Sequence, residues 1–192
     1  MKYSEMTWGR MEAIINKLGG ENGVDLFLRG ELTVSAPTRQ WREENGVIYF
    51  SVTSDGTTGE DWIKRLSVGY YAKQVLRSPD FKPTSGVTTE IGVLKGELFT
   101  DKDRITDKIR LKAVQSKMIL PEAEVACLIR EKFTDKDLEA MGLIWIVAMH
   151  DPIKDSGGVP SLVSARRGGD GRWLDAYYDD PDGCWDRGVG FA

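Results

Sequence analysis

Apolar residues near the start of the chain recur at the three- and four-residue spacing of a helix. The residues that carry this spacing are Trp8, Met11, Ile14, Ile15 and Leu18. Gly19-Gly20 ends the pattern, so we expect one helix before it and a shorter one after it, within residues 6–30. Such a pair can form a DNA-binding helix-turn-helix in which Arg29 and Arg39 contact phosphate. The second helix carries too few basic or amide side chains for that role, and a small helical packing unit is favoured.

The next part of the chain combines strand-like and helix-like segments. Residues 47–53 are rich in β-branched and aromatic side chains and follow the turn signal Asn45-Gly46, so they are predicted to form a strand. Residues 57–66 and 70–76 are predicted to form two helices, and a threonine at the start of the first can cap it.

Residues 78–86 form the best candidate for a domain boundary, because two prolines and a glycine fall there with little apolar pattern. We therefore expect an N-terminal helical and β subdomain over residues 1–80 and a second domain over residues 87–192. The second domain is predicted to begin with a long strand over residues 87–99.

The second half of the chain is predicted to contain helices followed by strands. Residues 101–142 hold two helical patterns, and the second, which starts at Glu122, either continues or restarts at Thr134, which can act as a cap. Residues 143–150 form a nearly continuous apolar run, which is typical of a central strand covered on both faces. The order of these elements predicts an α+β fold.

The last part of the chain, residues 164–192, has a different composition. Glycine, aspartate, arginine and bulky aromatic residues are concentrated there, while lysine and glutamate are missing. Tyr and Trp supply contact area at low entropic cost, and Arg and Asp supply directional polar contacts. Trp173, Leu174 and Phe191 are expected to be core anchors, with polar residues between them. This composition favours a recognition surface over a solvated terminal loop.

This stretch resembles the end of a C-type lectin fold domain of the kind shared by formylglycine-generating enzymes and the variable proteins of diversity-generating retroelements. In those families an Arg-Gly-Gly-x-Trp-like strand is followed by a surface loop and a final Gly-Phe-Arg or Gly-Phe-Ala strand. Here Arg167-Gly-Gly precedes Trp173, and Gly190-Phe-Ala follows the loop. The chain departs from the pattern in the insertion Asp170-Gly-Arg and in Ala192, where arginine is commoner. The resemblance implies a C-type lectin-like fold in the C-terminal half, over the expected second domain.

The resemblance to the retroelement variable proteins also implies which positions vary. In that family adenine-directed mutagenesis changes asparagine-type codons, so variable positions hold Asp, Gly, Ser, Tyr, Cys, Arg or His on a fixed scaffold. The candidate ligand-binding positions are Asp170, Arg172, Asp175, Tyr177, Tyr178, Asp179, Asp182, Cys184, Trp185, Asp186 and Arg187, all but Trp185 being of the variable type. The scaffold positions are Gly168, Gly169, Trp173, Leu174, Gly190 and Phe191.

These positions lead to the hypothesis of a non-enzymatic, bacterial-type protein that binds an unidentified protein or surface ligand. Its aromatic anchors would be Tyr177, Tyr178 and Trp185. Arginines and aspartates between them would select partners by charge.

The composition narrows the class of protein. The 192 residues are 41% hydrophobic and 29% charged, with a formal net charge of -4, which is ordinary for a soluble globular protein. No basic face favours nucleic acid as a partner. No apolar run approaches the roughly 18 residues that span a bilayer, and no signal region precedes the first helix, so a cytoplasmic location is expected by default. The two cysteines are expected to be reduced.

Catalytic and metal-binding alternatives have weaker support in the sequence. His150 is the only histidine, and beside Asp151 it could act as a general base, but no nucleophile motif accompanies it and a structural histidine is favoured. An enzyme of the formylglycine-generating type would use cysteines, and Cys127 and Cys184 stand in no such motif. Residues 179–183 carry three aspartates that could bind Ca²⁺ but lack EF-hand spacing. No catalytic residue, metal ligand or cofactor is therefore assigned.

A regulatory protein acting through its N-terminal helices is a further alternative.

Overall fold

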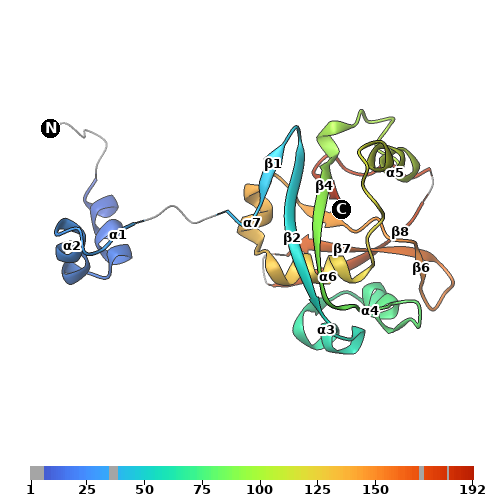
Figure 1. Ribbon diagram of the computed structural model, residues 1–192, viewed down its shortest axis with the longest axis horizontal. Helices are drawn as coiled ribbons and strands as arrows, with labels where there is room; N and C mark the ends of the chain where they lie inside the picture. Colours follow the sequence, from blue (N-terminus) through green and yellow to red (C-terminus); the bar gives the residue numbers. More distant parts are fainter. Residues whose placement is uncertain (1–6, 35–38, 169–170, 181) are drawn as a thin grey trace. The chain divides into compact units, whose positions relative to one another are not determined.

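The computed structural model describes residues 7–34, 39–168, 171–180 and 182–192 of the chain. It divides the chain into two compact units, one ending at Arg39 and the other beginning at Gln40 (Figure 1). The division lies well before the boundary expected at residues 78–86. That boundary falls inside the second unit, because the long strands on either side of it pair with each other. The expected subdomain over 1–80 and domain over 87–192 are corrected accordingly.

The first unit contains the two helices that the apolar spacing predicted, α1 (Trp8–Leu18) and α2 (Glu21–Leu28). The side chain of Thr7 caps α1 by accepting a hydrogen bond of 3.3 Å from the backbone N–H of Arg10. Gly19 ends the helix in the left-handed conformation, with a φ of 93°. This conformation suits glycine, which has no Cβ to clash with the following carbonyl group.

The second unit is a mixed α and β structure built on one large sheet. Its strands are β1 (Arg42–Glu44), β2 (Val47–Asp55), β3 (Ser67–Val68), β4 (Ser85–Lys95), β5 (Trp145–Val147), β6 (Ile153–Lys154), β7 (Pro160–Arg167), β8 (Arg172–Tyr178) and β9 (Val189–Phe191). Its helices are α3 (Gly59–Arg65), α4 (Tyr70–Arg77), the 3-10 helix η1 (Gly96–Leu98), α5 (Thr106–Gln115), α6 (Glu124–Lys132) and α7 (Asp135–Ala140). The predicted α+β class is confirmed at this level.

Within the described residues the strands follow the order β1-β2-β4-β9-β5-β7-β8-β3, and β6 adds to β7. Most neighbours are antiparallel, but β9 runs parallel to β5, and β3 runs parallel to β8. The predicted turn Asn45-Gly46 joins β1 to β2 with positive φ at both residues, as a two-residue hairpin turn requires. The apolar run over residues 143–150 predicted one long strand. The observed strand is shorter, because only Trp145–Val147 (β5) is assigned as strand within this run.

Two helices of the unit start at the threonine caps that their sequences predicted. Thr58 caps α3 by accepting a hydrogen bond from Asp61 N–H. Thr134 and Asp137 form a reciprocal capping box at the start of α7, so the second helical pattern restarts at Thr134 and does not continue through it. The intervening Phe133 has extended backbone and ends α6.

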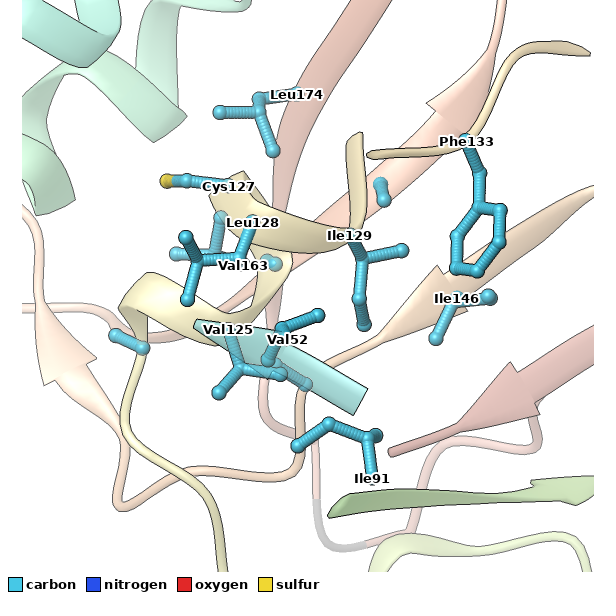
Figure 2. Close-up of a cluster of buried hydrophobic side chains, with 14 of the residues drawn as sticks. Val52, Ile91, Val125, Cys127, Leu128, Ile129, Phe133, Ile146, Val163 and Leu174 are labelled. Carbon is cyan, nitrogen blue, oxygen red and sulfur yellow. The ribbon is translucent and has the colours of Figure 1, made fainter. Parts of the chain in front are cut away.

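One face of the sheet packs against α6, whose residues 124–130 are all buried. Figure 2 shows Val125, Leu128 and Ile129 of this helix among Val52 of β2 and Val163 of β7. The helix lies between the strand β2 at one side of the sheet and β7 and β8 at the other. It therefore joins the two halves of the sheet through one hydrophobic core.

The opposite face of the sheet forms a second, smaller core beneath α5. Successive side chains of a strand point to opposite faces, so Ile146 lies in the first core and its neighbour Val147 in the second. Ile109 of α5, Leu94 of β4 and Phe191 of β9 complete the second core. Residues 146–150 are thus buried on both faces, as the apolar run predicted, whereas Ile144 is 47% exposed. In the described part of the chain, no helix is long and apolar enough to cross a membrane.

Candidate functional site

A row of aromatic side chains crosses the second face of the sheet, and its members come from β5, β8, β9 and the segment just before β9. The ring centroids of Trp145 and Tyr177 lie 5.0 Å apart, those of Tyr177 and Trp185 lie 6.4 Å apart, and those of Trp185 and Phe191 lie 6.0 Å apart. Phe191 is buried, but the other three rings are partly exposed. The structure therefore brings together two of the predicted anchors, Tyr177 and Trp185, and adds Trp145 from β5.

Trp185 is held in place by contacts with the start of α5. Its indole Nε1–H donates a hydrogen bond of 3.1 Å to Thr106 Oγ1, and its backbone N–H donates one of 2.8 Å to the carbonyl oxygen of Arg104. The guanidinium of Arg104, which is buried, donates in turn to the carbonyl oxygen of Trp185 over 3.0 Å. Because both backbone groups and the indole are bonded, this segment is fixed despite its lack of regular structure.

Charged groups flank the aromatic row. Arg166 of β7 lies 5.7 Å from the ring centroid of Trp145 and forms an ion pair of 3.3 Å with Asp175 of β8. The hydroxyl of Tyr177 is half-buried, and this burial raises the pKa of Tyr177 above its ordinary value. The surface therefore presents flat, partly buried aromatic rings beside the positive charge of Arg166 and the negative charge of Asp175. We call Trp145, Arg166, Asp175, Tyr177 and Trp185 the aromatic surface.

Sequence reasoning missed two members of the aromatic surface, Trp145 and Arg166. The apolar run places Trp145 in a central strand, and Arg166 lies within the recognition stretch 164–192 but is not one of the candidate binding positions. Strand alternation could have found them, since residues 164 and 166 of β7 pair with residues 175 and 173 of β8 on the same face. The pairing of β5 with β7, however, is not visible in the sequence.

Asp179, one of the predicted ligand-binding residues, is mostly buried and forms an ion pair within the fold. Its carboxylate pairs with Arg110 of α5 over 3.3 Å, and its side chain is only 10% exposed. Arg110 also donates a hydrogen bond of 3.2 Å to the carbonyl oxygen of His150. The Oδ1 atom of Asp179 is buried without a hydrogen-bond partner among the described residues. Asp179 therefore ties β8 to α5 and is poorly placed to contact a ligand.

Arg172 and Tyr178 lie on the other face of β8 from Tyr177, because residues two apart share a face. The guanidinium of Arg172 donates to the carbonyl oxygen of Glu131 in α6. Tyr178 is 54% exposed. The three predicted aromatic anchors therefore do not form one cluster, since Tyr178 stands apart from Tyr177 and Trp185.

The remaining predicted positions lie in the turns between β8 and β9. Asp182, Cys184, Asp186 and Arg187 are all exposed. The carboxylate of Asp186 accepts a hydrogen bond of 2.7 Å from Gly188 N–H, which shapes the turn into β9. Asp170, and the scaffold position Gly169, lie outside the described residues. Among the residues that are described, no group of acidic, histidine or cysteine side chains is placed to hold a metal ion.

The predicted scaffold positions pack against the core. Leu174 and Phe191 are buried, and Gly190 is buried beside Val93. Trp173 is partly buried, and a Cβ on Gly168 would lie 1.9 Å from its Cδ1 atom. A side chain at position 168 would therefore displace the indole of Trp173 or the backbone.

His150 has the geometry of a structural histidine. It is 2% exposed, its Nδ1–H donates to the carbonyl oxygen of Asp151 over 2.7 Å, and its Nε2 accepts from Val163 N–H over 3.0 Å. Burial lowers the pKa of His150 below its ordinary value, so the ring is neutral. Both nitrogens are occupied, and a carbonyl group, not the Asp151 carboxylate, orients the ring. These contacts count against the general-base interpretation.

The two cysteines are unpaired and have opposite environments. Cys127 is fully buried in α6, and this burial raises its pKa far above the ordinary value of a thiol. Cys184 is exposed, and its Sγ lies 3.0 Å from the carbonyl oxygen of Asp101. Cys127 is therefore part of the hydrophobic core.

A scan against models of known protein families found no match, and comparisons with curated proteins and with solved structures found none either. Function is therefore argued from the geometry of this chain.

Proposed function

We propose that this protein is a non-enzymatic binding protein that recognises a macromolecular ligand through the aromatic surface. The observation that carries the proposal is the partly exposed row Trp145, Tyr177 and Trp185. Hydrogen bonds hold Trp185 in place, and Arg166 and Asp175 flank the rings. Aromatic and arginine side chains dominate the energy of binding surfaces because they bury much area at little entropic cost. The fixed indole of Trp185 lowers that cost further.

We further propose that the second unit contains a C-type lectin-like domain of the retroelement variable type. The lectin-type fold requires a strand, two helices and then strands, and the order β4, helices, then strands β5 to β9 supports it, although the chain has three helices, α5 to α7, where two were expected. The exposure of the variable-type positions also supports it. Arg172, Tyr178, Asp182, Cys184, Asp186 and Arg187 are exposed, whereas the scaffold positions Leu174, Gly190 and Phe191 are buried.

Exposed positions can change without unfolding the protein, which is what a diversified surface needs. Asp179 is the exception, because its replacement would leave Arg110 without its ion-pair partner. If the locus is diversified, substitutions should therefore gather at the six exposed positions and spare Asp179. Sequencing the locus across a population tests this, and an even spread of changes over the chain would argue against diversification.

The binding proposal is tested separately by screening the full chain against an array of immobilised proteins and cell-surface preparations. The double variant Tyr177→Ala, Arg166→Ala removes one ring and the neighbouring cation. Tyr71→Ala is the control, because it removes an exposed tyrosine of α4 that belongs neither to the aromatic surface nor to the variable-type positions. A partner that binds the wild type and the control, and loses at least ten-fold in affinity with the double variant, supports the proposal. Equal losses in both variants contradict it.

A further inference from the structure

The strand β4 has one edge that is largely unpaired. Its residues Ser85–Leu94 pair with β2 on one side. On the other side β9 pairs only with Leu94 and Lys95. Within the described residues, no strand pairs with the stretch before Leu94 on that side. An open edge of this length is a template for another strand.

The alternation of a strand identifies the backbone groups at this edge. The N–H of Lys95 donates to the carbonyl oxygen of Gly46, so Lys95 directs its backbone groups toward the β1–β2 hairpin. Successive residues of an antiparallel strand bond in opposite directions. Thr88, Glu90 and Gly92 therefore present their N–H and C=O groups at the open edge. These residues span about 17 Å of strand when the end residues are counted.

A cleft of about 460 Å³ lies along this edge. One wall is β4 itself, and the other is formed by residues 116–122, the connection from α5 to α6, which runs beside β4 in Figure 1. Phe191 and Ala192 line the cleft where the short pairing with β9 ends. A strand placed in the cleft would thus lie in line with β9 and extend the sheet along β4.

Both faces of such a strand would meet apolar side chains. On one side the cleft is lined by Val125 and Leu128 of α6 and by Ile91 of β4, all three of which Figure 2 labels. On the other side it is lined by Ile109 and Ala113 of α5. A strand that is covered on both faces usually has a continuous run of apolar residues, not an alternation of apolar and polar ones.

The connection between α5 and α6 adds exposed apolar surface to the cleft. Ile119 is 89% exposed, and Leu120 is also exposed, although both line the cleft wall. Large apolar side chains exposed beside an unpaired strand edge are typical of a site that a partner covers.

We propose that this cleft binds an extended, apolar segment of another polypeptide, which adds as a strand to the open edge of β4. Backbone hydrogen bonds to Thr88, Glu90 and Gly92 would supply affinity, and the apolar walls would select a run of about five β-branched or aromatic residues. This site is separate from the aromatic surface and does not depend on the function proposed for it.

The test uses the full chain and a pool of synthetic peptides. Five central positions are drawn from valine, isoleucine, leucine and phenylalanine, with lysines at both ends for solubility. A second pool has the same side chains, but alternate central residues are N-methylated and lack the N–H group. We expect fluorescence polarisation to show binding of the first pool and at least ten-fold weaker binding of the second. Absence of binding, or equal binding of both pools, overturns the proposal.

Two variants of Glu90 locate the site. Glu90→Pro removes an N–H group at the open edge, where proline is tolerated because β2 does not use that group. Glu90→Ala is the matched control, since both variants lose the exposed ion pair with Arg42. We expect at least ten-fold weaker peptide binding by the proline variant and unchanged binding by the alanine variant.

Amide hydrogen exchange of the wild-type protein tests the same site without a variant, so it still applies if the proline variant misfolds. The amides of Glu90 and Gly92 should exchange at least ten-fold more slowly when the first pool is bound. Unchanged exchange at both amides overturns the proposal. A chain that dimerises through this edge and becomes monomeric in Glu90→Pro would also overturn it, because the occupant would then be a second copy of this protein.

Discussion

Arg110 and Asp179 join α5 to the end of β8 through an ion pair of 3.3 Å, and the Asp179 side chain is only 10% exposed. Removing one partner of such a pair leaves the other charge without compensation in a poorly hydrated place. Asp179 belongs to a stretch whose composition is typical of a binding surface. Because of this ion pair, its role is to stabilise the fold.

Asp179→Asn is therefore expected to lower the free energy of unfolding by about 2 kcal/mol, less than the roughly 3–5 kcal/mol of fully buried pairs because Arg110 is partly exposed. Asp182→Asn is the control, since Asp182 is exposed, and it should change the value by less than about 0.5 kcal/mol. Urea unfolding measures both. Equal stability of the two variants would mean that the ion pair contributes nothing.

His150 gives the protein a specific dependence of stability on pH. Its pKa in the folded state lies below the ordinary value of 6.5, so the unfolded chain binds the proton more tightly. The contribution of the neutral ring is complete above pH 6.5 and is lost as the pH falls toward the folded-state pKa, with a slope of at most about 1.4 kcal/mol per pH unit.

No other histidine is present, so His150→Gln should remove most of this slope between about pH 7.5 and pH 5.5. Urea unfolding at several pH values compares the two proteins. If the variant keeps the wild-type dependence of stability on pH, the dependence comes from carboxylates and not from His150. A wild type whose stability rises as the pH falls would instead show that His150 is favoured in its charged form.

The two thiols should react at very different rates. Cys184 is exposed, whereas Cys127 is fully buried with a raised pKa. A thiol reagent should therefore modify one cysteine of the native protein quickly and the second only on unfolding. Cys184→Ser should abolish the fast reaction, and Cys127→Ala should leave it unchanged. Rapid modification of both thiols in the native protein would contradict the burial of Cys127.

The local elements could be predicted because their signals are local. Helical spacing and Gly19 defined the first helix, Asn45-Gly46 defined the first hairpin, and Thr134 defined the restart of the last helix. Each depends on side chains within one or two turns of the chain, where spacing and capping chemistry determine the structure.

The domain boundary and two of the five residues of the aromatic surface could not be predicted because they depend on distant pairings. Prolines and a glycine in residues 78–86 mark a loop, but a loop between two strands of one sheet has the same composition as a linker between domains. Arg166 reaches the aromatic surface only because β5 lies beside β7, a pairing that the sequence does not show.

Gly168 tests whether the Arg-Gly-Gly-x-Trp-like pattern has a packing origin here. A Cβ at this position would lie 1.9 Å from Trp173 Cδ1, so Gly168→Ala must displace the indole or the backbone. Overpacking of this kind costs about 1–3 kcal/mol. Gly157→Ala is the control, because the nearest atom to its Cβ is a carboxylate oxygen of Asp155 at 3.2 Å, much farther than Trp173 Cδ1 is from a Cβ at position 168. Thermal unfolding of both variants should show a lower Tm for Gly168→Ala, together with a change in tryptophan fluorescence. Equal Tm values and unchanged fluorescence would show that glycine is not needed at position 168 for packing, and would leave binding as the reason for the pattern.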